Sequence, residues 1–294
     1  MPSTIPNDIV STDLLAPRTL ERIGCAHNDR LSPGTGITSG LKSLDRVTLG
    51  FHPGDLVVLS SLPHQGRTAL ALQIAIHNAV QEQIPVLIFS QALERHRIML
   101  RLIALESAVS LMEMRSGFWP RKHRLTIDKA AARLSKAPIS VIDTPALTTA
   151  DAAALAREHS DSLGQKNKRL GLIIVDDIDA FNAPTMSRQS ADRLYATAME
   201  WKKTAQNLQV PVLATARHMT FNQHRPMETD SLQSAVWARV ADVLIYVYRE
   251  PSPSLDSPEP ANCAKLFCVK NVHGRESCVE VDFNRRCGRF SDQQ

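Results

Sequence analysis

The chain has 294 residues, 43% of them apolar, which is enough to bury the core of one large domain or two modest ones. Its 34 basic and 30 acidic residues give a net charge of +4, so the chain is not a polycation, although this charge is compatible with a nucleic-acid partner. The five cysteines form no C-x-x-C pair, so neither a disulfide framework nor a zinc site is indicated.

The first 36 residues are polar and contain four prolines. They lack the charged and apolar regions of a signal peptide, and no run of the chain approaches the ~20 apolar residues of a membrane-spanning helix. The sequence therefore predicts a tail with a short helix for residues 1–36, one domain for residues 37–294, a cytoplasmic location and no membrane partner.

From residue 56 onward, apolar runs alternate with helical patterns. Continuous apolar runs, which are typical of strands covered on both faces, predict strands at residues 56–60, 86–90, 139–142, 172–175 and 212–215. Helical spacing predicts helices at residues 67–81, 95–107, 111–136 with a break near Gly117 and Pro120, 149–163, 188–208 and 234–238. Ser39 or Ser43 is expected to cap a short helix before the first strand, and Thr149 to cap the helix that it begins.

This alternation predicts an α/β fold with a mostly parallel central sheet and helices on both faces. The last part of the chain differs, because strand-like runs at residues 243–248, 265–269 and 279–283 follow one another without a helix between them. They predict a C-terminal β section, in which the Pro/Ser-rich residues 251–260 form a hairpin loop.

The turn after the first strand resembles a phosphate-binding loop, G-x-x-x-x-G-K-[S/T]. In that loop, backbone N–H groups and a helix N-terminus cradle phosphates, the lysine reaches the terminal oxygens, and the hydroxyl binds Mg²⁺. Ser61 stands at the first glycine and Arg67 at the lysine, whereas Gly66 and Thr68 are retained. The nucleotide-binding residues predicted from this turn are Ser61, Pro63, His64, Gln65, Gly66, Arg67 and Thr68.

A phosphate-binding loop also needs a carboxylate at the end of a buried strand to hold Mg²⁺ or its water. Asp176 directly follows the apolar run LIIV and is placed for that role. The alternative is an aspartate that caps a turn, but the loop upstream favours the metal. The sequence thus predicts ATP and Mg²⁺ as cofactors, with Thr68 and Asp176 at the metal.

Several segments together resemble the C-terminal RecA-like motor domain of the DnaB-type replicative helicases. They include GITSGLKSLDRVTLGFHPGD, the loop itself, MLRLIALES, LIIVDDIDA and ADVLIYVYRE followed by VKNVHG, and the similarity covers about residues 35 to 290. TLERI at residues 19–23 resembles the linker helix of this family, whose N-terminal helical domain is absent. The resemblance implies a RecA-like fold, single-stranded DNA as a partner, and a ring formed with itself or with a DnaB-type helicase.

The chain departs from the family at positions that carry its chemistry. The phosphate-loop lysine falls on Arg67, the catalytic glutamate on Ala92, a glutamine on Arg217 and the arginine finger on Val272. A general base contributes ~10²- to 10⁴-fold in rate, and an arginine finger about 10³- to 10⁵-fold. The resemblance with these departures implies weakened hydrolysis.

Substitutes for the lost groups are Asp177, which follows the metal-binding aspartate, Glu94, and Arg217 or Arg275 for the positive charge. The alternative for each is a solvated surface charge. For DNA, the central-channel loops of the family correspond to residues 182–193 and 219–230, and the predicted DNA contacts are Arg188, Arg193, His224 and Arg225. Ordinary charged loops are the alternative there.

Two functions fit these observations. The first is an ATP-dependent DNA helicase used in replication, and the second is an inactive helicase paralogue that acts as a ring partner, a loader or an inhibitor. The related RadA-type recombination ATPases are disfavoured, because the chain lacks their four-cysteine zinc motif.

Overall fold

The structure is a computed structural model that describes residues 36–181, 190–217, 232–249 and 263–293, together with residues 12–13, 16–17 and 19–20. The chain divides into two compact units, Met1–Gly36 and Ile37–Gln294. The described residues of the first unit are helical, apart from Gly36.

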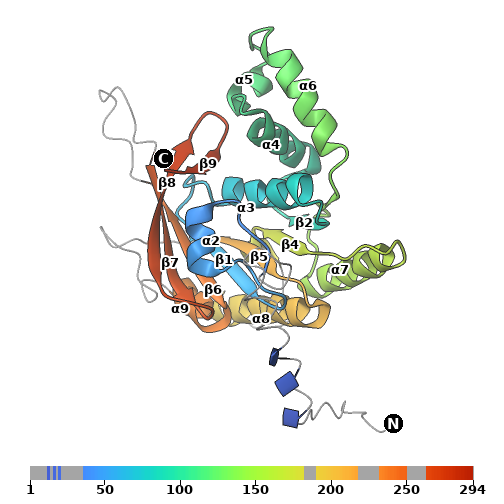
Figure 1. Cartoon of the computed structure of the whole chain (residues 1–294), viewed down its shortest axis with the longest axis vertical. Coiled ribbons are helices and arrows are strands. Elements are labelled where there is room, and N and C mark those ends of the chain that lie inside the picture. The colour runs from blue at the N-terminus through green and yellow to red at the C-terminus, as the bar shows by residue number, and fades with distance from the viewer. Residues whose placement is uncertain are drawn as a thin grey trace. The chain divides into compact units, whose positions relative to one another are not determined.

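One sheet runs through the second unit, and its described strands lie in the order β3-β2-β4-β5-β1-β6-β7-β8-β9 (Figure 1). The strands that pair in parallel are β1 (Leu56–Ser61), β2 (Val86–Ser90), β3 (Ile139–Ile142), β4 (Leu172–Asp176), β5 (Val212–Arg217) and β6 (Val243–Tyr248). Antiparallel pairing adds β7 (Cys263–Asn271), β8 (Ser277–Asn284) and β9 (Arg289–Asp292). The predicted α/β fold with a parallel sheet and a C-terminal β section is confirmed.

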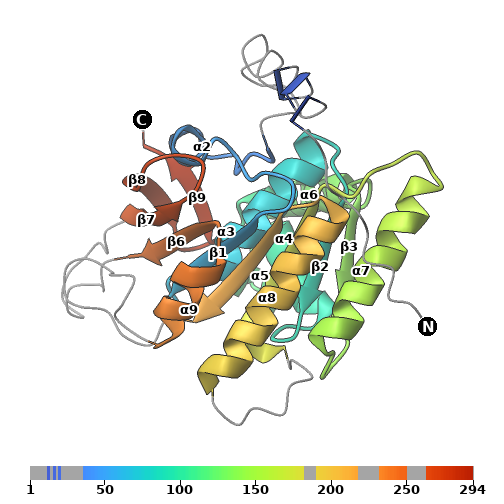
Figure 2. The same ribbon diagram turned by 90° about the horizontal axis from the view of Figure 1, so that it is seen from below.

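Helices cover both faces of the sheet (Figure 2). One face carries α2 (Lys42–Thr48), α3 (Arg67–Ile76) with its continuation His77–Gln81, α4 (Arg95–Ser107) and α6 (His123–Leu134), with α5 (Leu111–Ser116) next to α4. The other face carries α7 (Thr149–Gly164), α8 (Ser190–Leu208) and α9 (Leu232–Val240). None of the described helices is both long and apolar enough to cross a membrane.

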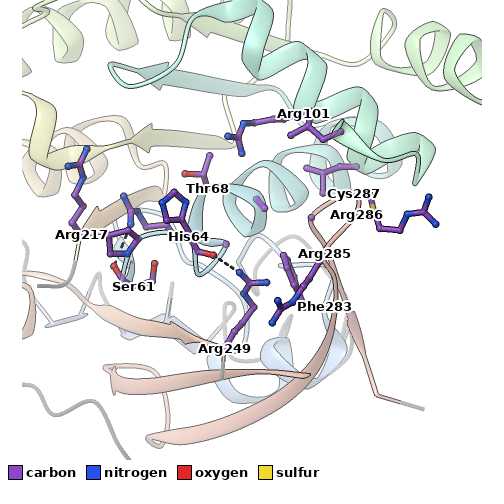
Figure 3. Close-up of a pocket in the computed structure, with 17 residues that line it drawn as sticks. Ser61, His64, Thr68, Arg101, Arg217, Arg249, Phe283, Arg285, Arg286 and Cys287 are labelled. Atoms are coloured by element: carbon purple, nitrogen blue, oxygen red, sulfur yellow. Dashed lines mark hydrogen bonds between the residues drawn. The ribbon is translucent and has the colours of Figure 1, made fainter. Parts of the chain in front are cut away.

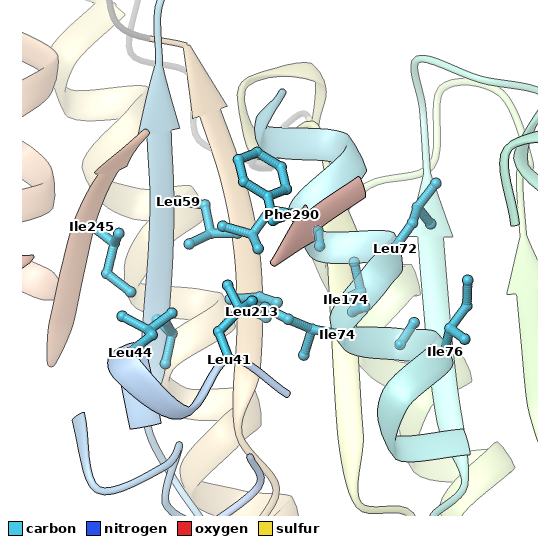
Figure 4. Close-up of a cluster of buried hydrophobic side chains, with 14 of the residues drawn as sticks. Leu41, Leu44, Leu59, Leu72, Ile74, Ile76, Ile174, Leu213, Ile245 and Phe290 are labelled. Atoms are coloured by element: carbon cyan, nitrogen blue, oxygen red, sulfur yellow. The ribbon is translucent and has the colours of Figure 1, made fainter. Parts of the chain in front are cut away.

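The continuous apolar strands supply both hydrophobic cores, because successive side chains of a strand point to opposite faces. In β1, Val57 and Leu59 join the core beneath α2, α3 and α4, whereas Leu56 and Val58 join the core beneath α8 and α9. Figure 4 shows the first core, where Leu59 and Leu213 of neighbouring strands pack with side chains of the covering elements. This double cover holds the strand ends, and the loops that follow them, in fixed positions.

The structure corrects the predicted helix caps. Thr149 begins α7, but the cap is Thr148, whose hydroxyl accepts a hydrogen bond from the N–H of Asp151 at 3.1 Å. Neither Ser39 nor Ser43 caps α2. Its first N–H groups, at Lys42 and Ser43, donate instead to the carboxylate of Asp292 at 2.8 and 3.0 Å.

Other differences concern the last strands. The short strand β9 was not predicted, because its four residues carry no apolar run. No disulfide joins the cysteines in the described part of the chain, which are Cys263, Cys268, Cys278 and Cys287. The predicted hairpin loop at residues 251–260, and residue Cys25, lie outside the described residues.

Candidate nucleotide site

The predicted phosphate-binding loop lies between β1 and α3, and its shape depends on Gly66. This residue is the N-cap of α3 with φ 103°, a left-handed conformation that glycine adopts without strain. A Cβ atom there would lie 3.1 Å from Cζ of Phe290. The first N–H groups of α3 have no acceptor within the helix, so the loop presents free donors to an anion.

A hydroxyl and a carboxylate meet beside the loop. The hydroxyls of Thr68 and Thr215 both donate to Oδ1 of Asp176, at 2.9 and 2.6 Å. Asp176 is only 4% exposed, and this burial raises the pKa of its carboxyl group, against the lowering effect of the two hydrogen bonds. Hydroxyl and carboxylate oxygens are the donors that Mg²⁺ prefers.

No cluster of three or more His, Cys, Asp or Glu side chains that could hold a metal occurs among the described residues. A Mg²⁺ ion beside Thr68 and Asp176 would therefore complete its coordination with water and with oxygens of a ligand, as is usual in phosphate sites. The residues fit that arrangement, and Asp176 Oδ1 already lies within hydrogen-bond distance of the loop hydroxyl.

The guanidinium group of Arg67 is turned toward a second carboxylate. Its Nη2 donates to Oδ2 of Asp177 at 3.0 Å, and Nε of Arg217 donates to the same oxygen at 3.0 Å. The Asp177 side chain is 3% exposed, whereas the side chain of Arg67 is 14% exposed. Nε of Arg67 is buried and has no hydrogen-bond partner in the described part of the chain.

Asp179 adds a third carboxyl group next to this pair. Its Oδ2 accepts the backbone N–H of Arg217 at 2.7 Å, and its own N–H approaches Oδ1 of Asp177 at 3.4 Å. Burial and the neighbouring Asp177 carboxylate raise the pKa of Asp179 to about 7. The end of β5 is thereby tied to the turn after β4.

A cavity of about 540 Å³ opens over the loop (Figure 3), a volume in the range of small-molecule sites. None of the residues that line it is acidic. Its six arginines come from five parts of the chain and are Arg67, Arg101, Arg217, Arg249, and the neighbouring Arg285 and Arg286 of the turn between β8 and β9. Guanidinium groups form strong hydrogen bonds with phosphate oxygens, so the cavity suits a polyanion.

The cavity also has an apolar part. Leu105 of α4, Leu111 of α5, and Phe283 and Cys287 of the C-terminal β section line it. A ligand with phosphates at one end and a largely apolar ring system at the other matches this division.

The predicted loop residues largely line the cavity: Ser61, Pro63, His64, Gly66, Arg67 and Thr68. Gln65 does not, and instead accepts a hydrogen bond from the backbone N–H of Arg249 at 2.6 Å. Of the proposed substitutes, Arg217 lines the cavity, but Asp177 and Glu94 do not. Glu94 is exposed at the start of α4.

The remaining predicted positions lie elsewhere. Ala92 is exposed after β2, and Val272 is 56% exposed in the turn between β7 and β8. Arg193 is exposed on α8. The other predicted DNA contacts, Arg188, His224 and Arg225, lie outside the described residues.

Four of the cavity arginines were not predicted from the sequence: Arg101, Arg249, Arg285 and Arg286. One of them carried a readable signal. Arg101 falls on the same helix face as Ile98 and Leu105, three and four residues away, where a charge is unexpected. Burial lowers the pKa of its guanidinium group. The other three gave no such signal, because they sit at strand ends and in a turn.

The fold is that of a RecA-like domain, and the predicted phosphate-binding loop lies between its first strand and the helix that follows. The chain belongs to the family described as the DnaB-like helicase C-terminal domain, whose model matches residues 36–292. It is similar to the replicative DNA helicase DnaB of Leifsonia xyli subsp. xyli, with 30% identity over 88% of this chain and 56% of that protein. It is also similar to the DnaB of Geobacillus stearothermophilus, with 28% identity over 93% of this chain and 60% of that protein.

Among solved structures, the ATPase domain of G40P matches with a TM-score of 0.87 and 21% identity, over 98% of this chain and all of that one. This match concerns the fold. The chain spans little more than half the length of the curated relatives named above.

Proposed function

We propose that the chain is a DnaB-like subunit of DNA replication that binds ATP and Mg²⁺ in the arginine-lined cavity and hydrolyses ATP weakly. The observation that carries this proposal is the placement of six arginines and no acidic residue around a phosphate-binding loop. The triphosphate would lie against the loop and the start of α3, and the nucleoside against Leu105, Leu111 and Phe283.

Each group of the loop has a distinct task in this proposal. The backbone N–H groups and Arg101 bind phosphate oxygens, while Thr68 and Asp176 hold the metal. Bound Mg²⁺ would supply charge neutralisation of the phosphates. Arg67 has a planar guanidinium group in place of the compact ammonium group of a lysine, so its positive charge and its N–H donors are arranged differently.

Weak hydrolysis follows from the groups that are missing around the terminal phosphate. Ala92 has no carboxylate to orient a water molecule, and Val272 has no charge to offer a neighbouring subunit. Asp177 and Glu94 remain candidates to orient water, but two arginines already share Oδ2 of Asp177, and Glu94 is exposed outside the cavity. We therefore expect the chain to bind ATP although it hydrolyses ATP slowly.

Single-stranded DNA and a ring of DnaB-type subunits are the proposed partners. Support comes from membership of the family, from relatives that are named replicative helicases, and from exposed Arg193 on α8. Basic loop residues would bind phosphates without regard to sequence, as a translocating protein requires.

A second candidate function is that of an inactive paralogue, which joins, loads or inhibits a helicase ring. The specific observation in its favour is the exposed Val272, because an apolar side chain stands where the family carries its trans-acting arginine. Such a subunit would hold nucleotide without completing the site of its neighbour.

The proposal is tested by titrating the purified chain with ATP, with and without Mg²⁺, and repeating the titration with Asp176→Asn. We expect micromolar binding that Mg²⁺ strengthens, and at least about a tenfold loss in the variant, since each 1.4 kcal/mol is a factor of ten. An amide can still accept the bonds of Thr68 and Thr215, so the variant should fold. Absence of ATP binding by the wild-type chain would overturn the proposal.

A further inference from the structure

The apex of the phosphate loop is held by a residue outside it. Arg249 follows β6 and makes three hydrogen bonds to the loop. Its backbone N–H donates to Oε1 of Gln65 at 2.6 Å, its Nε donates to the carbonyl oxygen of Gln65 at 3.0 Å, and its Nη2 donates to the carbonyl oxygen of His64. Figure 3 shows the Arg249 side chain reaching His64 across the cavity wall.

These contacts orient the peptide groups of the loop. In a trans peptide the C=O and the following N–H point in opposite directions. Because the carbonyl of Gln65 is directed to Arg249, the N–H of Gly66 is directed away from it. Gly66 is the N-cap of α3, and the N–H groups at the start of the helix have no acceptor within it. Arg249 therefore fixes the direction of a donor at the point where a phosphate would bind.

The loop needs such a restraint. His64 has φ 65°, a left-handed conformation that costs a non-glycine residue about 1–3 kcal/mol. In the absence of the two bonds from Arg249, both His64 and Gln65 are free to adopt other backbone angles. The bonds thus offset the strain of the conformation that is seen.

Arg249 is itself held by the C-terminal β section. Its guanidinium carbon lies 4.1 Å from the ring centroid of Phe283, which is paired with Phe290 at 4.6 Å. Phe290 is anchored to α3, because the Gln73 side chain exchanges two hydrogen bonds with its backbone, at 2.8 and 2.9 Å. The loop therefore contacts Arg249, Arg249 contacts the Phe283–Phe290 pair, and this pair is bound to α3, the helix that follows the loop.

We infer that Arg249 is a positioning residue for nucleotide, which acts through the carbonyl groups of His64 and Gln65 to keep the loop in its phosphate-binding form. The inference rests on the proposed nucleotide function and deepens it. A planar guanidinium can reach two carbonyls and stack on a ring at once, whereas a lysine ammonium offers one compact group. The role therefore requires arginine.

The test compares Arg249→Met, Arg249→Lys and the control Arg285→Met. Methionine keeps an apolar stem on Phe283, and Arg285 lines the same cavity without a hydrogen bond to the loop in the described part of the chain. Two quantities are measured: amide hydrogen exchange of residues 62–68 in the ligand-free protein, and the affinity for Mg-ATP and for inorganic triphosphate.

We expect Arg249→Met to accelerate amide exchange at residues 62–68 at least about tenfold, the equivalent of 1.4 kcal/mol. The affinity for Mg-ATP and for inorganic triphosphate should fall by a similar factor. Arg249→Lys should recover only part of either loss, and β4 should exchange as in the wild type in every variant. Arg285→Met should leave loop exchange unchanged.

Loop exchange in Arg249→Met equal to that in Arg285→Met would overturn the inference, as would full recovery by lysine. A loss of affinity without a change in exchange would also overturn it, because Arg249 would then act by direct contact with the ligand. Failure of the wild-type chain to bind either ligand would refute the proposed function, and loop exchange would still test the role of Arg249.

Discussion

Arg67 and Arg217 donate to the same oxygen of Asp177, Oδ2, each at 3.0 Å. One buried carboxylate thus lies between two guanidinium groups, and the resemblance to the family places a lysine and a glutamine at the positions of these two arginines. Asp177 acts as their counter-ion, and it determines where the charge of Arg67 lies before any ligand enters.

Replacing Asp177 by asparagine should therefore destabilise the ligand-free protein. Removal of one member of a buried ion pair leaves the other uncompensated. Because the Arg217 side chain is 58% exposed, we expect a loss at the lower end of the range for buried pairs, about 3 kcal/mol, in the free energy of unfolding. A bound polyanion would replace the lost charge, so the rise in Tm on adding ATP should be larger for the variant than for the wild type.

The control for this comparison is Asp128→Asn. Asp128 pairs with Arg124 on the surface of α6, with side chains 54% and 69% exposed, and such pairs contribute little. Equal stability of the two variants in denaturant unfolding would contradict the role given to Asp177.

Gly66→Ala tests the packing of the loop against the C-terminal β section. The new Cβ would meet Phe290 at 3.1 Å, and φ 103° disfavours any side chain. We expect a loss of about 1–3 kcal/mol in stability together with weaker nucleotide binding.

Gly164→Ala is the matched substitution, because a Cβ at that position meets no atom within 4 Å. It should change neither stability nor binding appreciably. If Gly66→Ala behaved in the same way, the contact between the loop and Phe290 would not constrain the site.

The buried carboxyl group of Asp179 predicts a pH dependence of stability. Its pKa is raised from 3.8 to about 7, so between these values the folded protein keeps a proton that the unfolded chain has lost. The free energy of unfolding therefore falls as the pH rises through this window, and the full penalty applies above pH 7.

Asp179→Asn removes the penalty and keeps an acceptor for the N–H of Arg217. The variant should be more stable than the wild type by about 1–2 kcal/mol near pH 8, well below the full value of the shift because Asp179 is only partly buried, and no more stable near pH 4. Thermal unfolding across this pH range measures the difference. A constant offset between the two proteins at all pH values would contradict this account of Asp179.

The strands of the sheet could be predicted from the sequence because each is recognisable from a few consecutive residues. The runs VLIF and LIIV are apolar at every position, as is typical of strands covered on both faces, and they form most of β2 and β4. The cap of α2 could not be predicted, because Asp292, which supplies it, lies about 250 residues away along the chain.

The sequence predicts only part of the arrangement around the loop. Gly66, Thr68 and Asp176 follow a spacing that the chemistry of phosphate and metal imposes, and the last two lie 2.9 Å apart through their side-chain oxygens. Arg249, in contrast, reaches the loop only because β6 pairs with β1. Such a residue becomes visible only when the strand order is known.

Steady-state ATP hydrolysis at saturating Mg-ATP, with and without single-stranded DNA, tests the central claim most directly. Typical enzymes turn over at about 1–10³ s⁻¹, and the loss of a general base alone removes ~10²- to 10⁴-fold. The account predicts turnover below about 0.1 s⁻¹ by a chain that binds ATP. DNA-stimulated turnover of about 1 s⁻¹ or faster, abolished by Asp176→Asn, would contradict it.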